Sequence, residues 1–310
     1  MATHALPDHF ASFFRRLNPG ASFESTASSQ YNSIKSLIED RSGPAAVLEP
    51  VCFLQGSYKQ QTSIHSINDV DVVALCKLWQ PGSGVGRSFG RDEIFQTVAS
   101  PLLNDMRYRS KVRFGPTSMC IKVDLGIKVE ILPVVFRAGN SDPASEPFKM
   151  YRPSTQSWGD GFARYHQAYL TLKNKSERTG GNFIPAIKVF KHMRSIIGLS
   201  AVSFHIECLL YSLPDSLFLG SPADYIPCLL EAITATAASS LYGSILKTPC
   251  ADRDIFTPAE WSLDAWSNFH GQAHTWKVIA IAARDASTQA EAIRTWRVLL
   301  GDDYFPERVS

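Results

Sequence analysis

The sequence has no excess of one charge, no paired cysteine motif and no unbroken apolar run of membrane-spanning length. Its 31 Lys and Arg residues nearly balance 29 Asp and Glu residues, for a net charge of +2. This balance argues against a protein whose main task is to grip long nucleic acid, although a local basic patch is compatible with it. The six cysteines form no CxxC pair, which is typical of reduced thiols in a cytosolic protein.

Two further absences concern membranes. The most apolar long stretch, IPCLLEAITATAASSLYGSIL at 226–246, is interrupted by Glu231 and diluted with Ser and Thr, so it is typical of a buried helix. The N-terminal MATHALPDHF lacks the charged-then-apolar layout of a signal peptide. We therefore expect a cytoplasmic protein that does not associate with a membrane.

The hydrophobic period changes along the chain and predicts two parts. A helical stripe spans 23–40, and a second helix is expected at 91–106. Short β-branched runs predict strands, and these runs lie at 45–56, 69–78, 107–115, 118–126 and 128–136. After about Phe162 the pattern is almost wholly helical, and the Gly-, Pro- and Ser-rich segment 137–161 predicts a loop that contains the boundary. The expected domains are 1–160, an α/β core with N-terminal helices, and 161–310, a helical lobe.

Two aspartates stand in a run of valines, in DVDVVAL at 69–75. In a strand, Asp69 and Asp71 point to one face while Val70 and Val72 point to the other. A solvated strand face is the simple explanation for such a pair, but apolar neighbours indicate a strand buried on at least one side. Carboxylates held side by side in that setting repel each other unless a cation lies between them. The motif therefore raises the question of which metal ion it holds.

Glu130 is a third acid in a strand, between Val129 and Ile131. Hard oxygen ligands select Mg²⁺, with Mn²⁺ as the alternative, and such ions usually also bind substrate phosphates. A Gly-Ser pair, Gly56-Ser57, follows an apolar strand-like run, where glycine lets a phosphate approach the backbone and Ser57 adds a donor. By itself that pair is a weak signal, and a plain turn is the simpler explanation for it. Together these elements favour phosphoryl or nucleotidyl transfer assisted by two metal ions.

With these motifs the sequence resembles the polymerase-β-like nucleotidyltransferases, and within them the cGAS/DncV-like nucleotidyltransferases (CD-NTases) of bacterial CBASS anti-phage signalling. The resemblance rests on GSY at 56–58, DVD at 69–71, VEILPVV at 129–135, AIKVFKHMRS at 186–195, LSAVSFHIECLL at 199–210 and TWRVLLGDDYFP at 295–306. It spans nearly the whole chain. It implies an α+β fold with a mixed sheet flanked by helices, a C-terminal helical lobe, and an active-site cleft between the two.

The resemblance also implies roles for particular residues. Asp69, Asp71 and Glu130 would hold two Mg²⁺ ions, and Gly56 with Ser57 would hold the donor triphosphate. A second set would bind nucleotide from the helical lobe: Lys188, Lys191 and Ser203 at phosphates, and Phe204 stacked on a base. Solvated lysines and a core-packed Phe204 are the alternatives for that set.

The third acid departs from the family, which usually has Asp where this chain has Glu130. A glutamate reaches about 1.5 Å further, one carbon–carbon bond, so its backbone must lie further back from the ion. Asp124, in KVDLG, is the competing third ligand.

The implied activity joins NTPs, with ATP and GTP as the expected pair, into a cyclic di- or oligonucleotide second messenger. A downstream effector and regulatory CBASS proteins would be its partners, and long DNA is not expected as an activator. Two alternatives stay open. One is synthesis of linear oligonucleotides or nucleotidylation of a protein or small molecule; the other is a catalytically silent nucleotide- or RNA-binding module.

Overall fold

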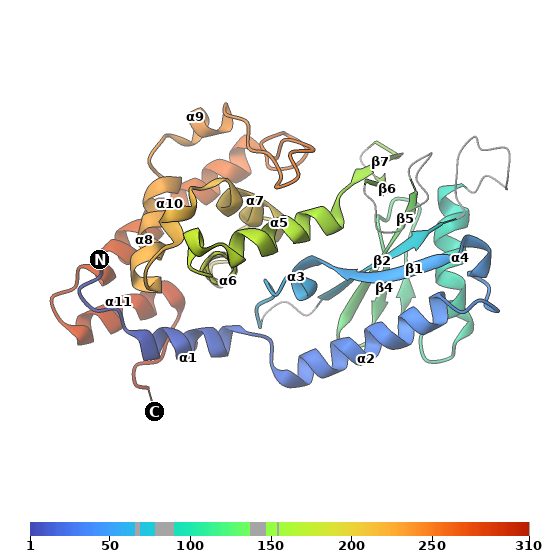
Figure 1. Ribbon diagram of the computed structural model, residues 1–310, viewed down its shortest axis with the longest axis horizontal. Helices are drawn as coiled ribbons and strands as arrows, with labels where there is room; N and C mark the ends of the chain where they lie inside the picture. Colours follow the sequence, from blue (N-terminus) through green and yellow to red (C-terminus); the bar gives the residue numbers. More distant parts are fainter. Residues whose placement is uncertain (66–68, 78–89, 137–146, 154, 310) are drawn as a thin grey trace. The chain divides into compact units, whose positions relative to one another are not determined.

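The computed structural model describes residues 1–65, 69–77, 90–136, 147–153 and 155–309. Contacts divide the chain into two units (Figure 1). The sheet unit comprises Gly20–Gln61 and Ile67–Gln167, and the helical unit comprises Met1–Pro19, Thr62–Ser66 and Ala168–Ser310. Each unit is described by itself below.

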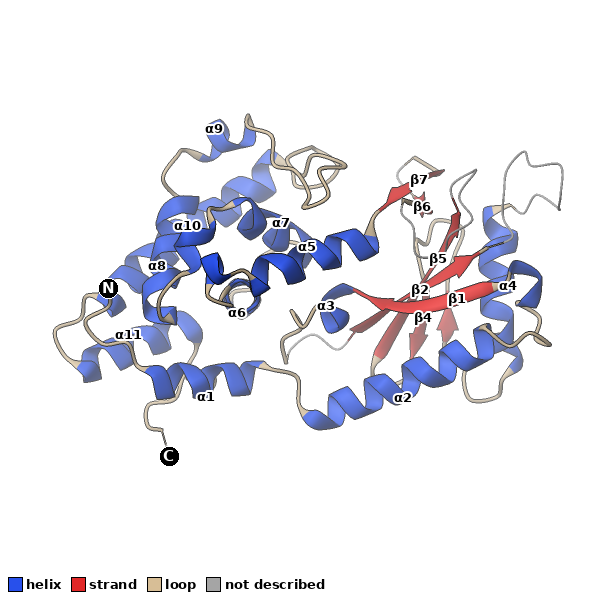
Figure 2. Ribbon diagram, viewed as in Figure 1, coloured by secondary structure: helices blue, strands red, loops and turns tan. Residues whose placement is uncertain are grey.

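The sheet unit is built on seven strands: β1 Pro50–Gln55, β2 Asp69–Cys76, β3 Val112–Arg113, β4 Ile121–Asp124, β5 Lys128–Phe136, β6 Phe148–Arg152 and β7 Ser157–Gly161. Five of them follow the order β1-β2-β5-β4-β3, while β6 pairs with both β5 and β7. Only the β2–β5 pair is parallel among these pairings, so the sheet is mixed, as predicted (Figure 2).

Alternation along β2 gives the sheet two different faces. Val70, Val72 and Ala74 pack in one buried cluster with residues of α2 (Ala21–Ile38) and α4 (Arg91–Asn104). Val73 and Leu75 belong to a second cluster on the opposite face, together with Leu132 and Phe148. Each such side chain, when fully buried, contributes about 1.5–3 kcal/mol. Asp69 and Asp71 are in phase with Val73 and Leu75, so the second face changes from apolar to acidic at the beginning of β2.

The helical unit contains α1 (Pro7–Leu17), the last part of α5 (Ala163–Lys175), α6 (Phe183–Ile196), α7 (Ser203–Ser212), α8 (Pro222–Ile233), α9 (Ala238–Tyr242), α10 (Leu263–Arg284) and α11 (Gln289–Leu300). The short α3 (Gly56–Lys59) and η1 (Ala46–Leu48) belong to the sheet unit, and η2 (Glu177–Thr179) and η3 (Asp215–Phe218) to the helical unit. Helical structure after Phe162 was predicted.

The N-terminal helix α1 lies in the helical unit, whereas the predicted split at 160/161 placed it in the core domain. Phe10 and Phe13 are buried, and the ring of Phe10 lies 5.2 Å from that of Trp296 and 5.1 Å from that of Phe305. These apolar contacts join the two ends of the chain, which a reading in sequence order does not anticipate.

Two local predictions are wrong. In the predicted loop 137–161, of which 137–146 lie outside the described residues, β6 and β7 form a hairpin, because FKMYR pairs with the second half of β5, Phe148 opposite Phe136. In the predicted strand 107–115 only Val112–Arg113 pair with β4. The preceding residues form turns, in which Asp105 accepts hydrogen bonds from the backbone and guanidinium of Arg107.

The cysteines are free thiols, as predicted, and Cys52, Cys76, Cys120 and Cys208 are buried. Among the helices that the structure describes, none is both long and apolar enough to cross a membrane.

Candidate active site

The parallel pairing of β2 and β5 places the predicted acids side by side. Asp71 lies opposite Glu130, and Asp69 lies opposite Lys128. Side chains opposite each other on neighbouring strands share one face, and the strands lie about 4.8 Å apart. All three acids are half-buried. The register therefore brings Asp69, Asp71 and Glu130 to one face at the same end of the sheet.

Gly56 lies directly against one of these acids. It begins α3 with a φ of +69°, and a Cβ at this position would overlap the Asp71 carboxylate. Only glycine combines this backbone conformation with such a close approach. The same register places Gln55 opposite Asp71, so Gly56 and Ser57 follow β1 at the acidic end of the sheet. The Gly-Ser element and the aspartates, which are separate motifs in the sequence, form one constellation.

The carboxylate of Glu130 is held by two groups near or on β4. Lys122 Nζ lies 3.0 Å from Oε1, and Cys120 Sγ donates to Oε2 over 3.4 Å. Glu130 and Cys120 together raise the pKa of Lys122. Burial, and secondarily the charge of Glu130, raises the pKa of the Cys120 thiol to about 12, so this thiol is a neutral donor at physiological pH.

Asp124 was the competing third ligand. It lies opposite Lys128 on β4 and is therefore two strands from Asp69, whereas Glu130 is one strand from Asp71. Its side chain is exposed and accepts a hydrogen bond from the Gly126 amide at 3.3 Å. The strand order favours Glu130 over Asp124 as the partner of the aspartates.

The donor set fits a hard divalent cation. The aspartates offer carboxylate oxygens on one face, and the close approach at Gly56 leaves the Asp71 carboxylate against backbone rather than a side chain. Among the described residues, however, no three His, Cys, Asp or Glu side chains converge as a ready-made metal site. This agrees with the contacts that turn Glu130 toward β4. Asp69 and Asp71 would hold the ion, and Glu130 would join them by changing its rotamer.

In the helical unit, the prediction that Lys191 binds phosphate is wrong. Its side chain is fully buried, and Nζ donates to Glu207 Oε1 at 2.6 Å and to Thr62 Oγ1 at 2.9 Å. A buried ammonium needs such partners, and here they occupy it. Lys191 therefore stabilises the unit and anchors the segment 62–65. Lys188, one turn earlier, is half-buried and donates to Asn18 Oδ1 at 2.7 Å.

Ser203 and Phe204 begin α7, and both are half-buried. Arg194 Nη2 lies 3.4 Å from Ser203 Oγ, and burial lowers the pKa of Arg194 from its ordinary value. The guanidinium of Arg253 lies over the ring of Phe204, 5.1 Å from its centroid. Core packing, the alternative for Phe204, is not complete, since part of the side chain is exposed.

Comparison with known proteins identifies a family and individual proteins to which this chain is similar. Residues 171–277 match the C-terminal helical domain of the cGAS/DncV-like nucleotidyltransferases. The cyclic UMP-AMP synthase of Rhodothermus marinus is 27% identical over 219 residues, which cover 64% of this chain and 75% of that protein. A cyclic nucleotide synthase of Staphylococcus haemolyticus is 26% identical over 195 residues, 54% of this chain and 64% of its own length.

The fold agrees with solved structures of the same group. The cyclic AMP-GMP synthase DncV of Vibrio cholerae, solved with a linear intermediate, superposes with a TM-score of 0.73 at 10% identity, covering 99% of this chain and 98% of that one. Residues 171–277 thus match a domain of the cGAS/DncV-like nucleotidyltransferases, and the chain as a whole is similar to proteins of that family. The predicted resemblance is confirmed, and with it the fold class of a mixed sheet flanked by helices and a C-terminal helical domain.

Three basic residues near the predicted site escaped the sequence analysis: Lys122, Arg194 and Arg253. Lys122 has a usable signal, since it precedes Asp124 by two in a predicted strand next to that of Glu130. Arg194 lies one turn after Lys191 on α6. Arg253 has no local signal, because its partners Asp252 and Glu260 define its position only in the folded loop.

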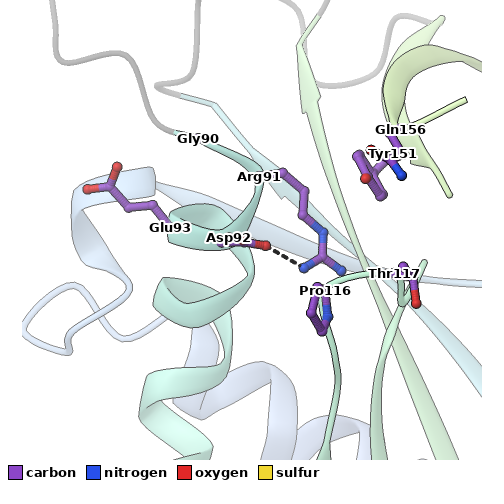
Figure 3. Close-up of a pocket in the computed structure, with 8 residues that line it drawn as sticks. All are labelled: Gly90, Arg91, Asp92, Glu93, Pro116, Thr117, Tyr151 and Gln156. Carbon is purple, nitrogen blue, oxygen red and sulfur yellow. Dashed lines mark hydrogen bonds and ion pairs between the residues drawn. The ribbon is translucent and has the colours of Figure 1, made fainter.

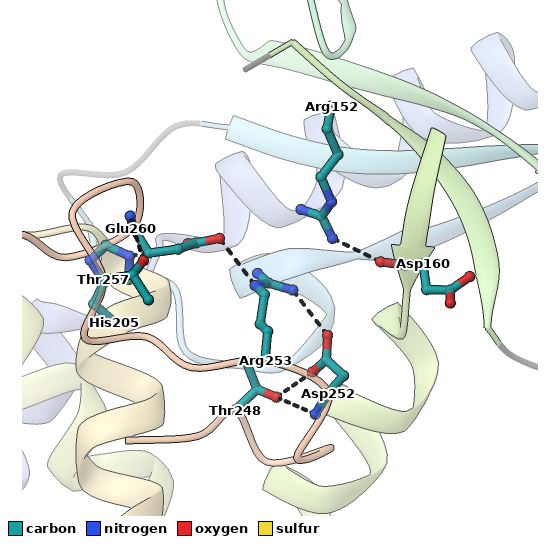
Figure 4. A network of polar contacts seen from close by, with 8 residues as sticks. All are labelled: Arg152, Asp160, His205, Thr248, Asp252, Arg253, Thr257 and Glu260. Carbon is teal, nitrogen blue, oxygen red and sulfur yellow. Dashed lines mark hydrogen bonds and ion pairs between the residues drawn. The ribbon is translucent and has the colours of Figure 1, made fainter. Parts of the chain in front are cut away.

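Figure 4 shows how the loop after α9 fixes Arg253. Its Nε donates to Glu260 at 3.1 Å and its Nη1 to Asp252 at 3.2 Å. Asp252 is in turn bound by Thr248. Glu260 also lies 3.7 Å from His205, whose ring stacks on Trp261. Because charged hydrogen bonds hold the guanidinium, Arg253 forms a fixed support for one face of Phe204.

The sheet unit also has a cavity of about 600 Å³ that is separate from the acids (Figure 3). Arg91 lines it, and its guanidinium donates to the carbonyls of Gly115 and Ser118 while stacking on Phe95. Phe95 packs on the face that carries Val70 and Val72, opposite to the acids. These contacts tie α4 to the turn before β4, and we assign the cavity no part in the reaction.

Proposed function

We propose that this protein is a Mg²⁺-dependent synthase that joins two or more nucleoside triphosphates into a cyclic nucleotide. The observation that carries the proposal is the β2–β5 register, which puts Asp71 beside Glu130. The Asp71 carboxylate also lies against Gly56. The named activities of the sequence relatives, both cyclic nucleotide synthases, support the reaction class.

In this reaction the residues of the chain would have the following roles. Asp69 and Asp71 hold the metal ions, with Glu130 as the third ligand. When bound, the ions would activate the attacking ribose hydroxyl and neutralise the pyrophosphate that leaves. Ser57 donates a hydrogen bond to the donor triphosphate, and the half-buried ring of Phe204 stacks on a base. Lys188 and Ser203 bind phosphate oxygens, and Arg194 orients Ser203. Holding both reactants in line lowers the entropic part of the barrier.

The substrates are ATP and GTP in our proposal, as the family resemblance implies. The Rhodothermus relative carries UMP and AMP in its name, which makes UTP with ATP the second candidate. Mass spectrometry of the product from all four NTPs decides between them. Phosphatase treatment distinguishes a cyclic product, which has no terminal phosphate, from a linear one. A labelled protein or small molecule in the mixture would instead indicate nucleotidylation, and failure to release pyrophosphate would indicate a silent binding module.

Asp69→Asn and Asp71→Asn test the site directly. Each should lower turnover at least about a hundredfold, because a neutral amide is a poor ligand for Mg²⁺, while the circular dichroism spectrum stays that of the parent. The matched control is Asp124→Asn, an exposed acid on the same sheet face, which should keep most of the activity. Full turnover in Asp69→Asn and Asp71→Asn, or an equal loss in Asp124→Asn, contradicts the assignment of the two aspartates as metal ligands.

The product would act as a second messenger that switches on a downstream effector in anti-phage defence. Cells that carry the chain and its neighbouring genes should resist phage, and cells with Asp69→Asn should not. Equal plaque counts on both strains would remove the defence role without affecting the enzymatic proposal.

A further inference from the structure

Lys122 is a cation of the acidic face whose contact with one of the acids is resolved. It lies directly opposite Glu130 across the β4–β5 pair, and Glu130 lies directly opposite Asp71 across the β2–β5 pair. The three side chains form a row on one face, in the order Asp71, Glu130, Lys122. Glu130 thus lies between the aspartates on one side and an ammonium group on the other.

Both carboxylate oxygens of Glu130 are engaged on the Lys122 side. Lys122 contacts Oε1 at 3.0 Å and Cys120 contacts Oε2 at 3.4 Å. This arrangement accounts for the absence, among the residues described, of a three-carboxylate cluster although the strand register is right for one. Because both contacts hold the carboxylate on the Lys122 side, Glu130 must change its rotamer, and so loosen these contacts, to reach an ion at the aspartates.

The contact is suited to release. The Lys122 side chain is 64% exposed and that of Glu130 31% exposed. Exposed ion pairs are weak because water screens the charges and the long side chains lose rotamer freedom. A divalent ion carries twice the charge of the ammonium, so it competes effectively for the same carboxylate.

We propose that Lys122 is a positioning residue that holds Glu130 away from the aspartates until a divalent cation displaces it. The proposal rests on the proposed function, since it assumes the metal site at Asp69 and Asp71. Lys122 neutralises Glu130 in the metal-free protein and withdraws when the ion binds. Metal affinity is thereby lower than the three acids alone would provide.

Binding of Mn²⁺ alone tests the proposal, measured by electron paramagnetic resonance on the full-length, nucleotide-free protein. Lys122→Gln should bind Mn²⁺ about three- to fivefold more tightly than the parent. The gain is small because the ion pair that competes with the metal for Glu130 is exposed and therefore weak. Lys122→Arg, which keeps the charge and reaches the same carboxylate, should bind like the parent. Because Lys122 is exposed, neither change should affect folding.

Two controls separate the ion pair from a general change of charge. Lys128→Gln removes a lysine from the same face, opposite Asp69 and Asp124, and should have a smaller effect. Adding Glu130→Gln should cancel the gain from Lys122→Gln, since the two residues act as a pair. Equal gains from Lys122→Gln and Lys128→Gln, or a gain that persists with Glu130→Gln, overturn the proposal.

The same measurement distinguishes this inference from the proposed function. Loss of Mn²⁺ binding in Asp69→Asn and Asp71→Asn, with no gain in Lys122→Gln, overturns the role of Lys122 alone. Unchanged binding in the aspartate variants, or no Mn²⁺ binding by any of the proteins, overturns the metal site and with it both proposals.

Discussion

At the scale of single residues, the candidate site depends on one position without a side chain. Gly56 combines a left-handed backbone conformation with the close approach of the Asp71 carboxylate. Any side chain there must displace the carboxylate, the strand that carries it, or α3. The glycine therefore couples the Gly-Ser element to the acidic strand through space, although more than ten residues separate them in the chain.

Gly56→Ala should lower the free energy of unfolding by about 1–3 kcal/mol, because backbone strain and the overlap with Asp71 add. It should also reduce the initial rate of nucleotide transfer at least about tenfold, since the carboxylate must move. Thermal unfolding and a pyrophosphate-release assay measure the two effects.

Gly126→Ala is the matched control for this change. Its φ of +82° is equally left-handed, but nothing lies within 4 Å of an added Cβ. It should lose stability from strain alone and keep its rate. If the two variants were equally impaired in transfer, the overlap with Asp71 would not matter to the reaction.

At the scale of elements, strands buried on both faces were predicted well. β5 spans Lys128–Phe136, the residues expected, and β2 spans Asp69–Cys76 within the expected 69–78. Continuous β-branched runs leave little choice of structure. The β6–β7 hairpin was missed because its Gly and Ser residues and the neighbouring prolines are typical of loops, and because its pairing partner β5 precedes it in the chain.

The burial of Lys191 is a property that the local spacing of residues cannot predict. Lys188 and Lys191 are three residues apart on one helix, yet one is half-buried and the other completely buried. The difference depends on Glu207 and Thr62, which reach Lys191 only in the folded chain. Burial of a charge is a tertiary property, and the sequence carries no local mark of it.

Lys191→Met should therefore lower the free energy of unfolding by about 3–5 kcal/mol, because it leaves the Glu207 carboxylate buried without its counter-ion. Replacing both residues, Lys191→Met with Glu207→Leu, should recover most of that loss. Urea unfolding followed by circular dichroism measures both. A single variant as stable as the parent would show that the ion pair does not hold the segment 62–65 in place.

At the scale of the whole molecule, the chain does not divide in sequence order. The helical unit takes residues from both ends of the chain and a short central segment, because α1 packs its phenylalanines against Trp296 and Phe305. The change of hydrophobic period along the chain correctly predicted that helices dominate after Phe162. It could not predict that the first helix joins the last, since nothing within α1 specifies its partner.

Phe13→Ala should destabilise the protein by about 3–5 kcal/mol, the usual loss for a fully buried phenylalanine. Phe14→Ala is the control, since Phe14 is half-buried on the same helix, and it should lose clearly less. Thermal unfolding compares them. Equal losses would mean that the contacts of Phe13 with Phe305 and His192 do not anchor the N-terminus.

The parallel ladder between β2 and β5 has a consequence for how such an enzyme can change over time. Backbone hydrogen bonds, rather than the intervening chain, fix the separation of Asp71 and Glu130. Turns within the stretch that connects the two strands can thus gain or lose residues without disturbing the acids, provided that α4 keeps its packing and β4 its pairing with β5. A shift of the β2–β5 register by a single residue would instead turn Glu130 to the opposite face of the sheet. A change of strand register is therefore far more damaging here than an insertion or deletion in a connecting turn.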